Sequence, residues 1–359
     1  MRHRTFPLDN ADQRAHSPNA SRSAAGNPDM KKGLVLCGVT VLFWALYAVY
    51  VRYAAAVWSI EPMVFGSVAT LTAGLTMLVI AGPGDLGRST LRDPHTWAYG
   101  LLDVVSITLA VGACFFATAT ELVLLLRVDV VFGLTLAWLV FGRRIRNTDL
   151  IGSVAILAGC ALAAAQMPPD NVGYAVLLIA LASLSRVAVT VISERHPTSN
   201  AADTVRKRCR ITGMIMLVSA LVFLAAVMIG ALVKAALPSD AVALHPALAA
   251  LPDAAGFIDP VTLAAALGLG VLVYAPATYF YLYAVRTAGT ETFFMMLVYQ
   301  PILTIGLERA LRDVTPLPAF EATPVLIAAI LCVIGGSTFM LGARYLKRPP
   351  TPGLPVPID

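Results

Sequence analysis

Two residues of opposite charge interrupt a stretch of hydrocarbon side chains, ELVLLLRVDVVFG at 121–133. A guanidinium can bind a carboxylate or a phosphate through two parallel hydrogen bonds, so Arg127 indicates a site for an anionic or zwitterionic small molecule. A carboxyl group in a low-dielectric environment can take up and release a proton, so Asp129 indicates coupling to a proton or another cation. Arg186 is a second candidate for the first role, and Glu121 a weaker candidate for the second.

The same charges also admit a purely structural interpretation. Asp103 and Arg186 lie within other apolar stretches, so Arg127 could pair with Asp103, and Asp129 with Arg186, to lock helices together. Positions 127 and 129 point about 200° apart on a regular helix and therefore cannot pair with each other. Glu121 lies near the end of its stretch, where it could simply face interfacial water. Both interpretations stay open at this point.

Further polar and aromatic residues are candidates for lining the same site. Gln300 and Pro301 occupy positions in the apolar stretch 290–310 that match those of Asp129 and Val130 in the stretch 119–141. A proline within a helix frees a backbone carbonyl and bends the helix. Pro276 is a second candidate helix break. The aromatic candidates for substrate binding are Trp44, Tyr47, Tyr274 and Tyr279. Core or lipid-facing packing is the alternative for the aromatic residues, and a packing kink is the alternative for Pro301.

These residues must be positioned by membrane-spanning helices. Hydrophobic residues make up 58% of the 359-residue chain and charged residues 13%, against the roughly 25% charged residues of a soluble domain. Apolar stretches of about 20 residues recur, and lipid requires that their backbone hydrogen bonds be satisfied within helices. The expected fold is an all-α integral membrane protein. Its ten expected spans are 33–53, 61–81, 96–117, 119–141, 149–167, 172–193, 211–234, 261–285, 290–310 and 322–343.

The distribution of basic residues predicts the orientation. If both termini are cytoplasmic, the cytoplasmic segments hold 20 of the 26 Lys and Arg residues. We therefore expect a multi-pass protein of the cell membrane with both termini in the cytoplasm. Residues 1–30 are predicted to form a disordered cytoplasmic tail, and residues 347–359 a second cytoplasmic tail.

The two halves of the chain resemble each other. TEL (120–122) opens the fourth span and TET (290–292) opens the ninth, while GSVAILAG (152–159) and AAILCVIG (328–335) share their spacing of small residues. Five spans per half is an odd number, so the second half must enter the membrane the opposite way up. The prediction is two inverted five-helix repeats, at 31–167 and 168–346, which enclose a site at the middle of the membrane.

At this point the chain resembles the EamA-type ten-helix members of the drug/metabolite transporter superfamily, over about residues 31–346. The matching stretches are LFWALYAVYVR (42–52), VVFGLTLAWLVFGRR (130–144), IGSVAILAGCAL (151–162), YFYLYAVRTAGTE (279–291), VYQPILTIGL (298–307) and IAAILCVIGG (327–336). The resemblance implies a secondary transporter that moves small metabolites, often outward, through a central cavity walled by both repeats.

The chain also departs from the pattern of that family. A proline is common in the fourth and ninth helices, and here Pro301 is present in the ninth while Val130 replaces it in the fourth. The LGE that often ends the fourth helix is replaced by Phe-Gly-Arg at 141–143. Trp44 is retained in the first helix, whereas Arg186 takes the place of the tryptophan in the sixth. Substrates known for other members therefore transfer poorly to this chain.

The expected function is efflux of small, anionic or zwitterionic, amino-acid-like metabolites by alternating access, with the lipid bilayer and a coupling proton or cation as partners. The alternatives are a non-transporting membrane partner or sensor protein and a membrane-embedded enzyme that modifies lipids. No HExxH, GxSxG or Cys/His cluster occurs in any span, so we expect no enzymatic activity, no metal and no cofactor. Most of the basic residues lie in connectors as topology requires, which argues against nucleic-acid binding.

Overall fold

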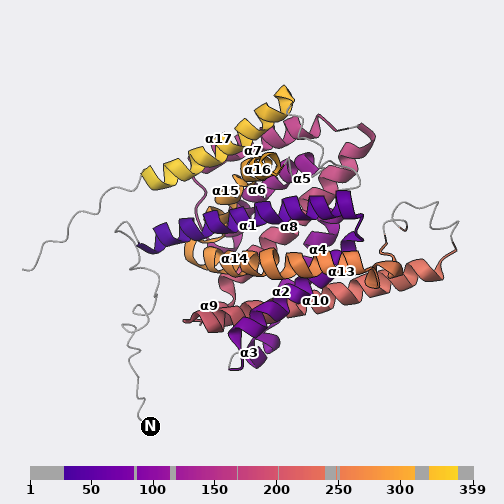
Figure 1. Cartoon of the computed structure of the whole chain (residues 1–359). Helices are drawn as coiled ribbons and strands as arrows, with labels where there is room; N and C mark the ends of the chain where they lie inside the picture. Colours follow the sequence, from indigo (N-terminus) through magenta and orange to yellow (C-terminus); the bar gives the residue numbers. More distant parts are fainter. Residues whose placement is uncertain are drawn as a thin grey trace, which may run out of the picture.

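The computed structural model describes residues 28–84, 87–113, 119–167, 169–200, 202–238, 248, 251–311 and 323–346, and the predicted tails at 1–30 and 347–359 lie almost entirely outside them. All regular structure in these residues is helical (Figure 1). The elements are α1 (Pro28–Trp58), α2 (Pro62–Ala81), α3 (Gly87–Arg92), α4 (Pro94–Ala113), α5 (Ala119–Leu125), η2 (Leu126–Val128), α6 (Asp129–Phe141), α7 (Asn147–Ala164), α8 (Pro169–Arg195), α9 (Pro197–Asn200), α10 (Val205–Ala236), η3 (Ala254–Phe257), α13 (Pro260–Leu269), η4 (Gly270–Tyr274), α14 (Ala275–Ala288), α15 (Thr290–Leu297), α16 (Gln300–Ala310) and α17 (Pro324–Leu346).

Nine helices or helix runs in the described residues are long and apolar enough to cross a membrane, which confirms an all-α membrane protein. The third predicted span, 96–117, is α4, which has the length but is not one of the nine. Its first turn carries Pro94 and His95, and Asp103 lies within it. It packs against α8 and α10, while Trp97, Leu101 and Val105 lie on an exposed face.

Local sequence explains where several helices begin. Glu61 caps α2 by accepting a hydrogen bond from the amide of Val64, and Pro62 occupies the first turn, where a missing amide hydrogen has no cost. Asp259 caps α13 in the same way through the amide of Thr262, at 3.0 Å. These caps fix where the chain enters a span.

The most extensive contacts between spans keep their pattern when each of the first five spans is exchanged with its counterpart five spans later. The second span packs on the seventh, α2 on α10, and the fifth on the tenth, α7 on α17 (Figure 1). The fourth packs on the ninth through α6 and α15. The third span packs on the sixth, α4 on α8, and the exchange turns this contact into that of the eighth span with the first, α14 on α1. Two related five-helix units would give this pattern, and the repeats at 31–167 and 168–346 stay a prediction.

Glycine permits the closest of these contacts, between α7 and α17. A Cβ atom added at Gly152 would lie 2.6 Å from the carbonyl oxygen of Gly336 and against the side chain of Met340. The helices can approach this closely only because Gly152 and Gly336 lack side chains. The small-residue spacing at 152–159 thus serves helix packing.

We expect replacement of Gly152 by Val to lower the free energy of unfolding by about 1–3 kcal/mol, because the added side chain overpacks a rigid contact. Thermal unfolding of the purified protein in detergent measures the change. Gly335→Val is the matched control, since an added Cβ at Gly335 on the neighbouring helix meets no atom within 4 Å. Equal melting temperatures for the two variants would contradict the close contact.

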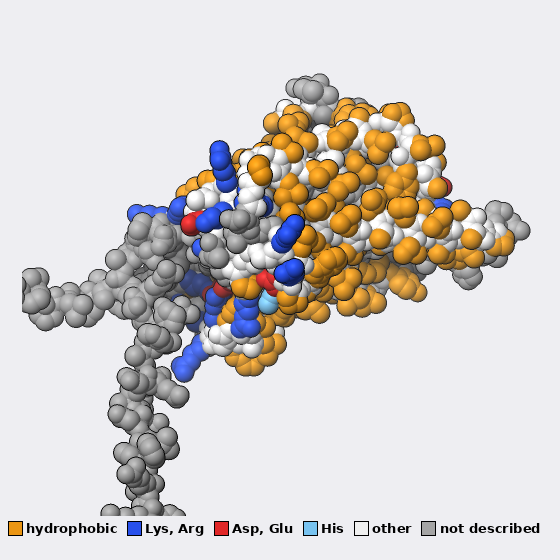
Figure 2. Space-filling view, turned by 90° about the horizontal axis from the view of Figure 1, so that it is seen from below, with side chains coloured by type: hydrophobic (Ala, Val, Ile, Leu, Met, Phe, Trp, Pro, Cys, Tyr) orange, Lys and Arg blue, Asp and Glu red, His pale blue; other side chains and the backbone are white. Residues whose placement is uncertain are grey.

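Basic side chains gather at one end of the molecule, whereas hydrophobic side chains cover most of the remaining surface in view (Figure 2). The ends of α8, α14 and α17 and the connector at 142–146 meet there and carry Arg195, Arg286, Arg344 and Arg143. We call this the basic end.

Candidate functional site

The fourth span is not a continuous α-helix. It breaks into α5 and α6 at the short 3₁₀ turn Leu126–Val128, and Arg127 lies in that turn. The ninth span breaks at the corresponding place, where α15 ends at Leu297 and α16 begins at Gln300 with Pro301 in its first turn. Breaks of this kind leave backbone carbonyls without a partner in the helix, and such carbonyls must be satisfied from elsewhere within the protein.

Arg127 supplies these missing hydrogen bonds. Its side chain is 1% exposed. Nε donates to the carbonyl of Val123 at 3.0 Å and Nη1 to the carbonyl of Leu297 at 2.7 Å. Nη2 donates to Oε1 of Gln300 at 3.4 Å. These contacts use three of the guanidinium's five N–H groups, so Arg127 joins the two broken spans and keeps donor capacity.

Asp129 and Arg186 form an ion pair within the membrane, with Nη2 and Oδ2 2.7 Å apart. The pairing that the sequence offered as a structural alternative is therefore present. Asp129 is 0% exposed, whereas the Arg186 side chain is 32% exposed. The pair is held by a single hydrogen bond, and the buried atoms Asp129 Oδ1 and Arg186 Nε have no hydrogen-bond partner in the described part of the chain. Each residue thus keeps unused capacity beside the other.

The second proposed pair, Arg127 with Asp103, is not among the ion pairs of the described residues. Arg127 bonds to carbonyls and Gln300 instead, as described above. Asp103 lies on α4, half-buried, and its carboxylate interacts electrostatically with the hydroxyl groups of four tyrosines. These are Tyr47, Tyr99, Tyr274 and Tyr281.

Three of the four aromatic candidates lie together. The ring centroids of Trp44 and Tyr47 are 5.3 Å apart, and that of Tyr274 lies 6.0 Å from Trp44 and 5.4 Å from Tyr47. Gln300 ties this cluster to Arg127, because its Nε2 donates to the carbonyl of Trp44 at 3.2 Å. Tyr279 packs against the same group of residues from farther along α14, beside Phe280 at 5.4 Å.

Pro276 and Glu121 are the remaining residues that the sequence proposed. Pro276 follows directly on the π-helical segment Gly270–Tyr274, which interrupts the eighth span. A π-helical segment of this kind inside an α-helix often accompanies a functional site. Glu121 lies in α5, and its side chain is outside the described residues.

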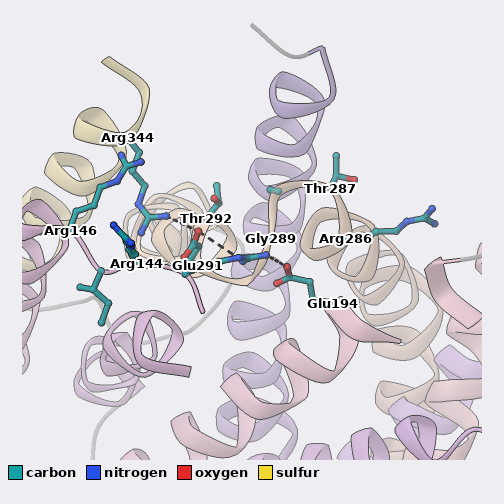
Figure 3. A pocket seen from close by; sticks show the side chains of 12 residues that line it. Arg144, Arg146, Glu194, Arg286, Thr287, Gly289, Glu291, Thr292 and Arg344 are labelled. Carbon is teal, nitrogen blue, oxygen red and sulfur yellow. Dashed lines mark hydrogen bonds and ion pairs between the residues drawn. The ribbon is translucent and has the colours of Figure 1, made fainter. Parts of the chain in front are cut away.

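A network of ion pairs at the basic end links both halves of the chain, and the sequence analysis did not predict it. Arg344, at the end of α17, contacts Glu291 at 2.9 Å and grips Asp149 through Nε and Nη2 at 3.2 and 3.0 Å. Arg143 pairs with Glu194 and lies 3.9 Å from Glu291 (Figure 3).

The network also fixes helix ends. Glu194 accepts hydrogen bonds from the amide and the hydroxyl of Thr290, at 2.8 and 2.6 Å, and so holds the start of α15 against the end of α8. Asp149 accepts from the amide of Arg146 at 3.0 Å and caps α7. One feature of the sequence could have indicated this network: acidic residues lie at the predicted cytoplasmic ends of spans, where the connectors otherwise carry Lys and Arg.

The comparisons with known proteins agree with this architecture. One solved crystal structure superposes with a TM-score of 0.61 at 16% sequence identity, over 89% of this chain and 99% of that chain. At that identity the likeness shows the fold alone. No curated protein matches the chain.

The sequence model of the EamA-like transporter family matches residues 31–165. This match confirms the resemblance noted in the sequence and indicates a membrane transporter. Members of the family are transporters and not enzymes, which agrees with the expectation for this chain. Residues 31–165 of this multi-pass membrane protein are similar to the EamA-like transporter family, which belongs to the drug/metabolite transporter superfamily.

Proposed function

We propose that the protein is a secondary transporter that exports small anionic or zwitterionic metabolites, such as amino-acid-like compounds, by alternating access. One observation carries the proposal. The pair of buried Asp129 and partly exposed Arg186 is held by a single hydrogen bond, and within the described residues Asp129 Oδ1 and Arg186 Nε have no hydrogen-bond partner. A pair that served only to lock helices would be expected to use these atoms, because an unsatisfied buried polar group costs about 1–3 kcal/mol.

The substrate would bind through the guanidinium of Arg186, which is the more exposed member of the pair. Arg127 would add its unused N–H groups, with Gln300 alongside, while Trp44, Tyr47 and Tyr274 form an aromatic wall. If the carboxylate of a substrate binds Arg186 in place of Asp129, the charge of Asp129 is left uncompensated in a low-dielectric environment. Asp129 would then take up a proton or attract a cation, which couples transport to that ion.

The broken helices support alternating access. The breaks at Leu126–Val128 and after Leu297, and the π-helical segment at Gly270–Tyr274, lie within spans and provide places where a span can bend. The ion-pair network of Arg143, Glu194, Glu291, Arg344 and Asp149 would close the basic end in one state and part in the other.

We propose that the protein lies in the cell membrane with its basic end on the cytoplasmic side. Lys and Arg are enriched on the cytoplasmic side of membrane proteins. The start of α1 lies against the end of α14, as the close approach of Gly33 to Ala288 shows, and α17 also ends at the basic end. Both termini would then be cytoplasmic, with repeats at 31–167 and 168–346.

A thermal-stability screen of the purified protein against amino acids, carboxylates and phosphorylated metabolites tests the proposal, since a ligand that prefers the folded state raises the melting temperature. We expect an anionic or zwitterionic compound to raise it in the wild type and in Arg92→Gln, which removes an exposed charge on α3, but not in Arg186→Gln. A ligand whose stabilising effect survives Arg186→Gln would contradict the assigned site.

A further inference from the structure

The basic end contains a cavity of about 760 Å³ that is separate from the proposed substrate site. It lies between the connector at 142–146, the end of α8, the end of α14, the start of α15 and the end of α17. Five arginines line it, against two glutamates. Its volume is in the range of cavities that hold small-molecule ligands, about 300–1,000 Å³.

The acidic residues of the lining are already engaged. Glu194 accepts from Arg143 and from the backbone and side chain of Thr290. Glu291 pairs with Arg344 at 2.9 Å. Arg286 points away from the other arginines (Figure 3). The charge balance of the cavity therefore depends on the remaining two arginines.

Arg144 and Arg146 are these two. Both are exposed, and neither forms an ion pair with any residue in the described part of the chain. They come from the same connector as Arg143, and Figure 3 shows both on the side of the cavity where Arg344 lies. Membrane topology accounts for positive charge at this end of the molecule, but any exposed connector position would satisfy it. It does not account for guanidinium groups gathered around one cavity.

We propose that this cavity binds a phosphate-bearing group through Arg144 and Arg146. Guanidinium groups bind phosphate oxygens through paired hydrogen bonds and lose less hydration energy than lysine does, so several arginines around a cavity favour a ligand with two or more negative charges. The group is either part of a soluble phosphorylated molecule or the headgroup of an anionic lipid.

Inorganic pyrophosphate is the probe, titrated by calorimetry into the full-length protein in a neutral detergent. We expect saturable binding in the wild type and a loss of affinity of at least tenfold in the double variant Arg144→Gln/Arg146→Gln. The matched control is Arg88→Gln/Arg92→Gln, which removes two exposed positive charges from α3, outside the cavity lining. Its affinity should equal that of the wild type.

Three results would overturn the proposal: no binding by the wild type, equal losses in the two double variants, or unchanged affinity in Arg144→Gln/Arg146→Gln. Melting temperatures without pyrophosphate show that each variant is folded. Nanodiscs of phosphatidylglycerol and of phosphatidylcholine then distinguish the two sources. A lipid headgroup in the cavity weakens pyrophosphate binding in phosphatidylglycerol only, and a soluble ligand gives equal binding in both. Either outcome supports the site.

Discussion

Replacement of Arg186 by Gln is expected to lower transport, measured per folded protein, by more than about 100-fold. A hydrogen bond to a charged group contributes about 1.5–3 kcal/mol, so losing a two-bond grip on an anion costs about 3–6 kcal/mol, and each 1.4 kcal/mol is a factor of ten. The change also leaves Asp129 buried without its partner, which costs about 3–5 kcal/mol if Asp129 stays ionised, so the amount of folded protein in the vesicles is measured for each variant. Uptake of the ligand found in the stability screen into proteoliposomes measures the loss.

Arg92→Gln is the matched control for this variant and is expected to transport normally. Arg127→Gln is expected to lose both transport and stability, because the carbonyl of Leu297 at the break in the ninth span loses its 2.7 Å hydrogen bond. Normal transport by both Arg127→Gln and Arg186→Gln would exclude the two arginines from substrate binding.

The second large effect is expected for Arg344→Gln at the basic end. This change leaves Asp149, which is 0% exposed, without its bidentate partner, and it also removes the 2.9 Å contact to Glu291. Removal of one member of a buried ion pair costs about 3–5 kcal/mol, because the other charge stays buried and unpaired. Thermal unfolding in detergent should show a correspondingly large fall in melting temperature.

A double-mutant cycle separates this cause from lost packing. Arg344→Gln combined with Asp149→Asn removes both charges and should recover part of the stability that Arg344→Gln loses. If Arg344→Gln costs less than about 1 kcal/mol, the pair behaves like a surface salt bridge, and a role for the network in closing the basic end is wrong.

The sequence predicted the spans because their signal is local. The second span, predicted at 61–81, is α2 at Pro62–Ala81, and the ninth, predicted at 290–310, ends at Ala310 as predicted. Length and hydrocarbon content determine such segments without reference to neighbouring helices. The exception is α4, which carries His95 and Asp103 and is not among the nine spans of the described residues.

The site was predicted only in part because its geometry depends on tertiary structure. The Asp129–Arg186 pair could be proposed by matching acids to bases among the few charges within spans. The partners of Arg127 could not, because the carbonyls it binds are free only where Val123 and Leu297 lie at helix breaks. The 3₁₀ turn at Leu126–Val128 contains neither proline nor glycine, so nothing in the local sequence indicates it.

The network at the basic end shows a different limit. From the sequence alone, Arg143 and Arg344 fit the excess of basic residues on the cytoplasmic side, and Glu291 fits an acid in the first turn of α15 that complements the helix dipole. These interpretations account for the residue types but contain no information on which span ends meet. Only the packing of α7 on α17 and of α15 against α8 brings the five charges together.

Solute counterflow in proteoliposomes tests the central claim most directly. Vesicles containing the protein are preloaded with unlabelled ligand, and entry of the same labelled ligand is followed. A carrier that works by alternating access predicts saturable entry, accelerated by ligand on the far side and absent in Arg186→Gln. Entry that is linear in concentration and indifferent to internal ligand, or no entry at all, would contradict a carrier and would favour a channel or a non-transporting membrane partner.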